Sequence, residues 1–310
     1  MEERKVAIIG SGCAGLTAAL YTARAGLSPL VIEGDESGGQ LSLTTLVENF
    51  PGFVEGIQGP ELIDNLRRQA ERFGAEFRTG RVKRLVLERR PYRLELEDGE
   101  VATQAVIIAA GARARWLGLP SEQALIGHGV SSCATCDGFF FRGRDIVVVG
   151  GGDSAMEEAL FLTRFASSVT LVHRRDQYRA SLIMLARAQA NPKIRWITNA
   201  EIVEIRDVEK QEVTSIVLQD TRTGRRRELP TAAVFLGIGH IPNTNFFGAA
   251  LETDSDGYLV TRDYVFTRTP GVFACGDVQD RRYRQAITAA GSGCMAAIEV
   301  ERFLQEHAAG

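Results

Sequence analysis

Two cysteines separated by two small residues lie near the middle of the chain. Cys133 and Cys136 flank Ala134 and Thr135 in the stretch SSCATCDGF. A C-x-x-C pair supports either thiol–disulfide exchange or metal binding. A zinc site needs a second ligand pair, whereas the three remaining cysteines are single and widely spaced: Cys13, Cys275 and Cys294. We therefore favour redox chemistry for the pair and expect the single cysteines to be small, buried apolar residues.

The surroundings of the pair must define its redox role. A thioredoxin carries its C-x-x-C at the start of a helix, after the first strands of a small domain, and this chain does not have that order of elements. A redox sensor and a catalytic relay both remain open on the pair alone. A catalytic relay needs an electron donor, so the rest of the chain has to supply a site for one.

Composition indicates the size class of the protein and argues against some kinds of partner. The chain has 310 residues, of which 45% are hydrophobic and 24% charged, and this is typical of a globular protein of about two domains. The net charge of −3 gives no reason to expect nucleic acid or an anionic membrane as a partner. No apolar stretch is long enough to cross a bilayer. Residues 1–5 lead straight into an apolar strand, so we expect no signal peptide and a cytoplasmic protein.

Two glycine-rich turns share one pattern of strand, turn and helix. The apolar run 6–9 leads into GSGCAG (residues 10–15), and the run 146–149 leads into GGGDSA (residues 150–155), each followed by a helical pattern. Such glycines let the chain turn tightly and bring a helix N-terminus against a pyrophosphate. One such motif alone is weak. Two in the same register predict two dinucleotide-binding βαβ units.

The residues after the second strand of each unit distinguish the two sites. In the first unit this residue is Glu33, whose carboxylate suits a free ribose 2′-OH. In the second unit the matching stretch carries His173, Arg174 and Arg175, with Arg179 further on. Arginines suit a 2′-phosphate, although a solvated strand end is the alternative. We therefore predict one dinucleotide without a 2′-phosphate, and NADPH as the other.

The order of these units predicts an α/β fold with two Rossmann-like, three-layer domains. Residues 1–114 form the first part of one domain, residues 115–244 form an inserted NADPH-binding domain with the dithiol, and residues 245–310 complete the first domain. The last segment has no glycine turn of its own and is too short for a good independent core. Residues 116–120 and 242–245 are the candidate linkers.

Two dinucleotides and a dithiol suggest an electron path. Hydride would come from NADPH, a flavin would relay it, and a disulfide would accept the electrons. The chain also resembles the low-molecular-weight, bacterial-type thioredoxin reductases over nearly its whole length. The resemblance rests on the following stretches: GSGCAG, GGQL, ENFPG, SSCATCDGFFF, GGGDSA, HRRDQYRA, GIGHIPNT, ACGD and YRQA.

This resemblance implies a thioredoxin-disulfide reductase that uses FAD and NADPH. It implies FAD contacts from Gly10, Ser11, Gly12, Cys13, Ala14, Gly15, Glu33, Gly34, Gly38, Gly39, Gln40, Leu41, Asn49, Val82, Ala110, Gly111, Gly276, Asp277, Arg284, Gln285 and Ala286. It implies NADPH contacts from Gly150, Gly152, Asp153, Ser154, Ala155, His173, Arg174, Arg175, Arg179, Ile238, Gly239 and His240. Cys13 and Ala110 depart from the proline and threonine usual in the family, and we favour neutral drift as the reason.

The resemblance also assigns roles within the dithiol. Cys136 would take electrons from the flavin, and Cys133 would attack the disulfide of a thioredoxin or thioredoxin-like partner. Asp137 is the candidate acid for this exchange, and a plain turn residue before Gly138 is an equally good interpretation. The family further suggests a homodimer.

Four other functions compete with this one. A relative with a ferredoxin as electron donor disagrees with Arg174 and Arg175. A ferredoxin-reductase-like flavoprotein or a non-enzymatic flavin-binding regulator would have no use for the CATC stretch. The reductase of a peroxide-reducing system would carry an additional thioredoxin-like region before the first strand, which we expect to begin near Lys5.

Overall fold

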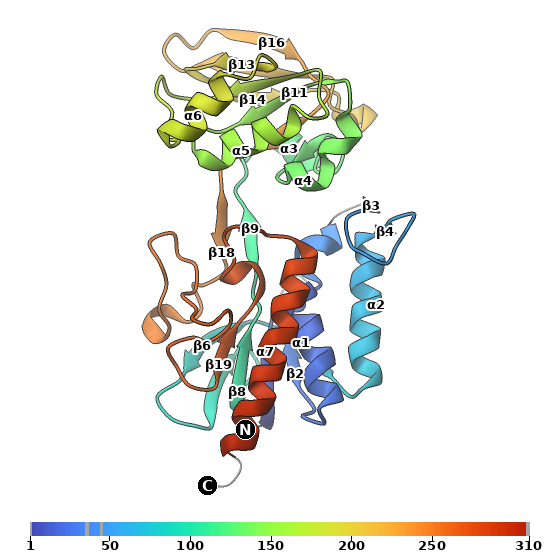
Figure 1. Cartoon of the computed structure of the whole chain (residues 1–310), viewed down its shortest axis with the longest axis vertical. Helices are drawn as coiled ribbons and strands as arrows, with labels where there is room; N and C mark the ends of the chain where they lie inside the picture. Colours follow the sequence, from blue (N-terminus) through green and yellow to red (C-terminus); the bar gives the residue numbers. More distant parts are fainter. Residues whose placement is uncertain (1, 35–36, 44–45, 308–310) are drawn as a thin grey trace. The chain divides into compact units, whose positions relative to one another are not determined.

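The structure is a computed structural model that describes residues 2–34, 37–43 and 46–307. It divides the chain into two compact units, one of Met1–Arg113 with Ile241–Gly310 and one of Ala114–His240. The predicted domain boundaries, after residues 114 and 244, lie slightly C-terminal to the boundaries of these units, which follow Arg113 and His240. Both units are α/β, so the predicted fold class is confirmed (Figure 1).

The first unit is built on a sheet that is parallel at its centre. Its strand order is β5-β2-β1-β8-β7-β6, and β19 also pairs with β8. The central strand β1 pairs in parallel with β2 and β8, whereas β7 is antiparallel to β8. The bounds are β1 (Glu2–Ile9), β2 (Leu30–Ile32), β5 (Glu76–Arg78), β6 (Val82–Val86), β7 (Tyr92–Leu96), β8 (Glu100–Ile108) and β19 (Val272–Ala274).

Alternating residues of β1 belong to two different apolar clusters. Val6 and Ile8 pack with small side chains of the helices, and Ala7 and Ile9 pack with the other side of the unit, which includes Leu94. A parallel strand covered on both faces needs apolar residues at every position. This explains the unbroken apolar run that precedes the first glycine turn.

Three helices complete the first unit: α1 (Cys13–Arg24), α2 (Gly59–Arg72) and α7 (Ala286–His307). Helix α7 lies against α1 (Figure 1). A Cβ at Gly293 would overlap the backbone of Ala14, so the two helices can approach this closely only with glycine there. The C-terminal segment therefore belongs to the core of the first unit. Its short elements are η1 (Gly39–Leu43), β3 (Leu46–Val47), β4 (Ile57–Gln58), η4 (Gly248–Ala250) and η5 (Gly276–Val278).

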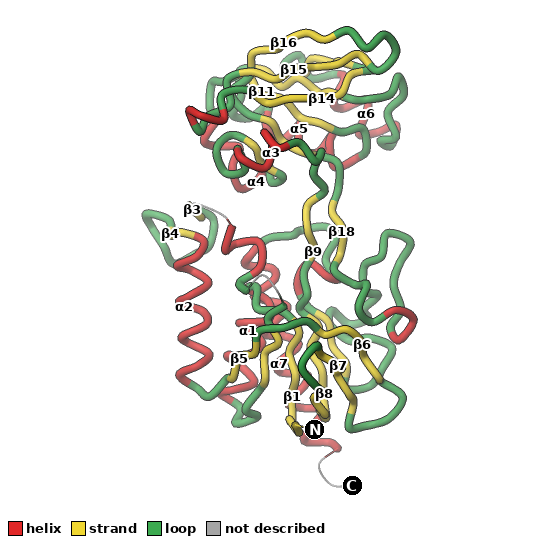
Figure 2. Tube along the Cα trace, turned by 180° about the vertical axis from the view of Figure 1, so that it is seen from behind, coloured by secondary structure: helices red, strands yellow, loops and turns green. Residues whose placement is uncertain are grey.

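The second unit has three layers. A parallel sheet of order β10-β17-β11-β12-β13 is covered by helices on one face and by the antiparallel sheet β14-β15-β16 on the other (Figure 2). Val148 of β11 packs on the helix side with Met156, and its neighbour Val147 packs on the other side with Leu218. The sheet bounds are β10 (Val130–Ser131), β11 (Asp145–Val149), β12 (Ser168–Val172), β13 (Ile194–Ile197), β14 (Ala200–Ile205), β15 (Ser215–Asp220), β16 (Arg226–Pro230) and β17 (Val234–Leu236).

The helices of this unit are α3 (Pro120–Ala124), α4 (Ala134–Asp137), α5 (Asp153–Leu162) and α6 (Leu182–Gln189), with the short turns η2 (Gly138–Phe141) and η3 (Val208–Lys210). The chain passes between the units through two short strands, β9 (Ala112–Ala114) and β18 (His240–Pro242), which pair with each other. Within residues 2–34, 37–43 and 46–307, no helix has the length and apolar character required to cross a membrane.

Segment 116–120, expected to be a linker, belongs to the second unit. The reason is Glu122, a fully buried carboxylate. It accepts hydrogen bonds from the backbone N–H groups of Leu117 and Gly118, each at 2.8 Å. Both oxygens of the buried carboxylate thus have a partner, and the segment is fixed.

Candidate functional site

The two central cysteines form a disulfide bond. Their Cα atoms are 5.3 Å apart, and the one-turn helix α4 begins directly after Cys133. The carbonyl of Cys133 accepts the N–H groups of Cys136 and Asp137 at 3.3 and 3.2 Å. Strand β10 ends at Ser131, so the disulfide follows the carboxyl end of a parallel strand. Ligand and active sites of open α/β sheets form at these ends.

A serine that the sequence analysis did not single out organises the environment of the disulfide. The buried Ser131 Oγ accepts the N–H of Cys133 at 3.0 Å, and the Ser131 side chain hydrogen-bonds the Asp137 carboxyl. Burial raises the pKa of Asp137, and the hydrogen bond from Ser131 partly opposes this rise. Thr135 Oγ1 lies 3.4 Å from the sulfur of Cys133. The only sequence signal for Ser131 is its position two residues before a cysteine at the end of an apolar strand.

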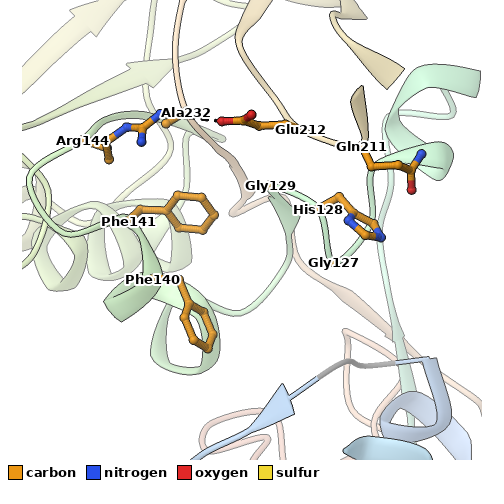
Figure 3. A pocket seen from close by; sticks show the side chains of 9 residues that line it. All are labelled: Gly127, His128, Gly129, Phe140, Phe141, Arg144, Gln211, Glu212 and Ala232. Carbon is orange, nitrogen blue, oxygen red and sulfur yellow. Dashed lines mark ion pairs between the residues drawn. The ribbon is translucent and has the colours of Figure 1, made fainter. Parts of the chain in front are cut away.

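Two exposed aromatic rings follow the disulfide in the chain, beside a pocket with a polar rim. Phe139 and Phe140 are 53% and 49% exposed. A pocket of about 230 Å³ opens beside Phe140, and Figure 3 shows His128 on one side of it and the rings of Phe140 and Phe141 on the other. Its rim also carries an ion pair between Arg144 and Glu212, at 3.8 Å.

The first glycine turn, residues 10–15, packs closely on its surroundings. A Cβ at Gly15 would overlap the carbonyl of Gly10, and a Cβ at Gly10 would overlap that of Ala109. The turn also meets the loop that follows β2, because Gly38 N donates to Ser11 Oγ at 3.0 Å and Gly39 lies against Gly12. The glycine turn and the loop after β2, both of which are predicted to contact FAD, therefore lie side by side.

Other predicted residues of the first unit also come together at this turn. Cys13 begins α1, and burial raises the pKa of its thiol to about 12, so it stays protonated at neutral pH. It shares an apolar cluster with Leu41 and Ala286, which follow Gln40 and Gln285. Gln285 accepts a hydrogen bond from Asn49 at 3.3 Å, and the backbone of Arg284 accepts one from Gln285.

Glu33 is buried at the end of β2, and its carboxylate is already engaged. Its Oε1 accepts hydrogen bonds from Ser37 Oγ and from Arg67 Nη1, both at 2.6 Å. Arg67 lies on α2 with its guanidinium over the ring of Phe77, 4.4 Å from the ring centroid. Sequence reasoning missed Arg67 because it is distant in the chain and no motif marks it.

The remaining predicted residues of the first unit lie at its strand ends. Gly34 pairs with Gly80, and Val82 begins β6 with its side chain in the core. The carbonyls of Ala110 and Gly111 accept hydrogen bonds from Asn243, at 2.8 and 3.0 Å.

Gly276 and Asp277 open the short turn η5. A Cβ at Gly276 would lie 2.8 Å from that of Ala14, so this turn adjoins the first glycine turn. Burial raises the pKa of Asp277 to about 7, and the nearby Asp280 adds to the rise.

In the second unit, the glycine turn of residues 150–155 repeats this construction. A Cβ at Gly150 would overlap the carbonyl of Gly237, and Ala155 packs against both of these glycines. Gly152 caps α5, whose first residues are Asp153 and Ser154. The segment after β17 contains Ile238, Gly239 and His240; Ile238 packs in the core, and the Gly239 carbonyl accepts the N–H of Arg115 at 3.0 Å.

The loop of residues 173–181, called the arginine loop below, presents three of its predicted side chains to solvent and buries the fourth. Arg174, Arg175 and Arg179 are exposed, whereas His173 is 7% exposed. Burial and the three arginines lower the pKa of His173, so its ring is neutral at neutral pH. His173 therefore differs from the three arginines of this stretch in both exposure and charge.

Comparison with known proteins agrees with this geometry. The family model "Pyridine nucleotide-disulphide oxidoreductase" matches residues 4–293. A thioredoxin reductase of Mycolicibacterium smegmatis is 57% identical over 302 residues, covering 97% of this chain and 96% of the relative. A bifunctional thioredoxin reductase/thioredoxin of Mycobacterium leprae (strain TN) is 55% identical, covering 98% of this chain and 66% of the relative.

A solved structure extends the likeness to three dimensions. The crystal structure of thioredoxin reductase from Streptococcus pyogenes MGAS5005 has a TM-score of 0.94 at 41% identity, covering 98% of this chain and 99% of that one. The resemblance inferred from the motifs is thereby confirmed. The chain belongs to the pyridine nucleotide-disulphide oxidoreductase family and, within it, to the thioredoxin reductases of the bacterial type.

Proposed function

We propose that this protein carries electrons from NADPH through FAD to the Cys133–Cys136 disulfide and from there to the disulfide of thioredoxin. One observation carries the proposal: the disulfide and the exposed arginine loop belong to the same unit, each at the carboxyl end of a strand of one parallel sheet. A redox disulfide and a 2′-phosphate site on one scaffold suit an NADPH-linked disulfide reductase.

The glycine turn of residues 10–15 is the proposed FAD site. Helix α1 begins within it, at Cys13, and offers free N–H groups to a pyrophosphate. Glu33 holds its second carboxylate oxygen ready for a ribose hydroxyl, while Oε1 is bound by Arg67. When bound, FAD would accept a hydride from NADPH and release electrons in a form that a disulfide can take.

Proton and electron balance define the roles around the disulfide. Cleaving the S–S bond with two electrons leaves an electron pair on each sulfur, so two protons complete the dithiol. We assign Cys136 to electron uptake and Cys133 to attack on the partner's disulfide. Asp137 suits the proton donor because its buried carboxyl keeps a proton to higher pH than an exposed one.

The surface beside the disulfide supports a protein as the partner. Phe139 and Phe140 present apolar rings next to the dithiol, and large exposed apolar groups mark protein contact surfaces. Reduction of a thioredoxin fits the cytoplasm, where such proteins keep thiols reduced.

We also propose a homodimer formed through the first unit. Tyr21 on α1 and Met295 and Ile298 on α7 are exposed by 43%, 45% and 37%. These two helices pack side by side. The three side chains therefore add exposed apolar surface to the same pair of helices. The measurement is the molar mass of the purified protein in solution, and a monomer would contradict this part of the proposal.

The test of the function is turnover with defined substrates. Purified protein should show a flavin absorption spectrum and should oxidise NADPH only when oxidised thioredoxin is supplied. NADH should be a much poorer donor, and Cys133→Ser, which keeps both cofactor sites, should reduce its flavin but not thioredoxin. Reduction of thioredoxin by the Cys133→Ser protein at the normal rate would refute the assignment.

A further inference from the structure

We propose that Thr135 is a catalytic residue of the dithiol: its hydroxyl stabilises the thiolate of Cys133 and thereby makes Cys133 the attacking sulfur. In the sequence Thr135 is only one of two small residues between the cysteines. The role rests on the proposed reduction of a partner's disulfide, and it deepens that function by naming the group that activates one of the two sulfurs.

The hydroxyl of Thr135 is a hydrogen-bond donor to Cys133. Its Oγ1 lies 3.4 Å from the Cys133 Sγ. In the disulfide this sulfur carries no hydrogen, so the hydrogen of the contact belongs to the threonine hydroxyl. A charged acceptor forms a stronger hydrogen bond than a neutral one. The hydroxyl therefore binds the Cys133 thiolate of the reduced protein more tightly than it binds the disulfide, and it favours the charged form.

The backbone around the pair holds Thr135 and Cys133 in this relation. The carbonyl of Cys133 accepts the N–H groups of Cys136 and Asp137 at 3.3 and 3.2 Å, and the N–H of Cys133 donates to Ser131 Oγ at 3.0 Å. These bonds do not involve the two sulfurs, so opening the S–S bond leaves them in place. The hydroxyl, two positions further on the same turn, thus stays within reach of the reduced sulfur.

The other groups around this turn do not replace the hydroxyl. Asp137 on the same turn is a carboxyl, and its ionised form would oppose a thiolate on Cys133. The guanidinium of Arg142, just after η2, lies over the ring of Phe139, 5.1 Å from the ring centroid. Helix α5, which packs on α4, meets the end of the turn with the apolar side chain of Leu162. A neutral hydroxyl donor is therefore the group of this turn that can stabilise negative charge on the sulfur.

The hydroxyl acts at the first step of the exchange. The Cys133 thiolate attacks one sulfur of the partner's disulfide, a new S–S bond forms, and the partner's own S–S bond breaks. The leaving thiolate takes the proton that Cys133 gave up, carried by Asp137. Cys136 then attacks the Cys133 sulfur and restores the disulfide, and its proton goes to the partner's second sulfur. Two electrons and two protons pass to the partner.

Two variants of the exposed Thr135 test this role without opening the core. Thr135→Val removes the hydroxyl at nearly constant size, and Thr135→Ser keeps it. Both are made in flavoprotein with Cys136→Ser, in which Cys133 is the one thiol left of the pair. The rate of alkylation of Cys133 by iodoacetamide is followed between about pH 6 and pH 10 by mass spectrometry of peptides, which separates Cys133 from the partly exposed Cys294.

The expected rates follow from the strength of one hydrogen bond. Because the threonine is exposed, its bond to the thiolate lies at the low end for charged acceptors, about tenfold in the equilibrium between thiol and thiolate. A thiolate that is tenfold more basic is also about threefold more nucleophilic. Thr135→Val should therefore react about threefold more slowly than the parent at neutral pH and about threefold faster at high pH, where both thiolates are complete. The two profiles should cross, and Thr135→Ser should follow the parent.

Three results would overturn the role. Slower alkylation of Thr135→Val at every pH would show that the side chain acts only through its shape. Equal profiles for Thr135→Val and Thr135→Ser would show that the hydroxyl has no effect. An equal change at Cys136, measured in Cys133→Ser protein, would contradict the selective activation of Cys133. If the parent protein did not reduce thioredoxin, the proposed function would fail, whereas the alkylation profiles would still decide whether Thr135 acts on Cys133.

Discussion

Replacing Asp277 with asparagine should stabilise the flavin-free protein at neutral pH and have no effect in acid. Burial, with help from Asp280, raises the pKa of this carboxyl from the ordinary value of 3.8 to about 7. The unfolded chain therefore releases the proton near pH 4, whereas the folded protein retains it up to about pH 7. Between these values the folded state binds more protons, so stability falls as pH rises.

The size of the effect follows from the shift. Each pKa unit corresponds to about 1.4 kcal/mol, so a shift from 3.8 to about 7 costs the folded state about 4 kcal/mol at pH 7 and above. Asp277 keeps some contact with solvent, which makes this value an upper limit. Asparagine has the same shape without the charge, so it should remove the cost. The gain should be near zero below pH 4 and grow by about 1.4 kcal/mol per pH unit up to pH 7.

The assay can separate the two units. Trp116 and Trp196 are the only tryptophans of the chain, and both belong to the second unit. Urea unfolding of flavin-free protein should be followed by tryptophan fluorescence and by far-UV circular dichroism at pH 5 and pH 8. Asp277→Asn should shift the circular dichroism transition at pH 8 and leave the fluorescence transition unchanged.

Two results would refute the reasoning. An equal gain at pH 5 and pH 8 would show that the carboxyl does not titrate between these values. A shift in the tryptophan signal would show that the substitution acts outside the first unit. The same titration predicts that flavin, if it needs the ionised carboxylate, binds more weakly as pH falls below 7.

The other predictions concern the dithiol and one buried ring. Cys133→Ser should leave a Cys136 thiolate that forms a charge-transfer absorption band with oxidised flavin, and Cys136→Ser should lose that band; identical spectra would contradict the assigned roles. Ser131→Ala should raise the pKa of Asp137, because the lost hydrogen bond lowers it, and should move the alkaline limb of thioredoxin reduction to higher pH. Ser131→Thr, which keeps the hydroxyl, is the control, and an unmoved limb in the alanine protein would exclude Asp137 as the acid. Tyr178→Phe should stabilise the second unit by about 1 kcal/mol in urea unfolding, since the Tyr178 hydroxyl is buried without a hydrogen-bond partner in the described structure, and a loss of stability would show that it has one.

Residues that act through local geometry were predictable from sequence. Gly15 is required by its close approach to the carbonyl of Gly10 in the same turn, and Gly150 packs against Ala155 at the start of the helix that follows it. Gly10 belongs to the same local motif, although the backbone that it approaches is that of Ala109. The cysteine pair is likewise local. These patterns depend only on spacing, so the family, the fold class and the disulfide could be inferred without coordinates.

Residues that act through distant contacts were not predictable. Arg67 reaches Glu33 from helix α2, which follows much later in the chain. Glu122 bonds backbone groups only four and five residues before it, but no motif marks that its carboxylate is buried. The position of His173 depends on Gly151, which lies on a different loop of the unit. Burial and partner choice are properties of the tertiary structure, and the residue types alone do not determine them.

The division of the first unit into two chain segments has a consequence for biosynthesis. Strand β19 pairs with β8, and α7 covers α1, yet both come from the part of the chain that follows residue 241. On a ribosome that adds about 5–20 residues per second, the second unit can complete its core before α7 exists. The nascent first unit must wait with α1 and the edge of β8 uncovered. We expect this waiting state to be the point at which the growing chain needs chaperones, and a substitution that weakens the α1–α7 contact should lower the yield of folded protein more than the activity of the protein that does fold.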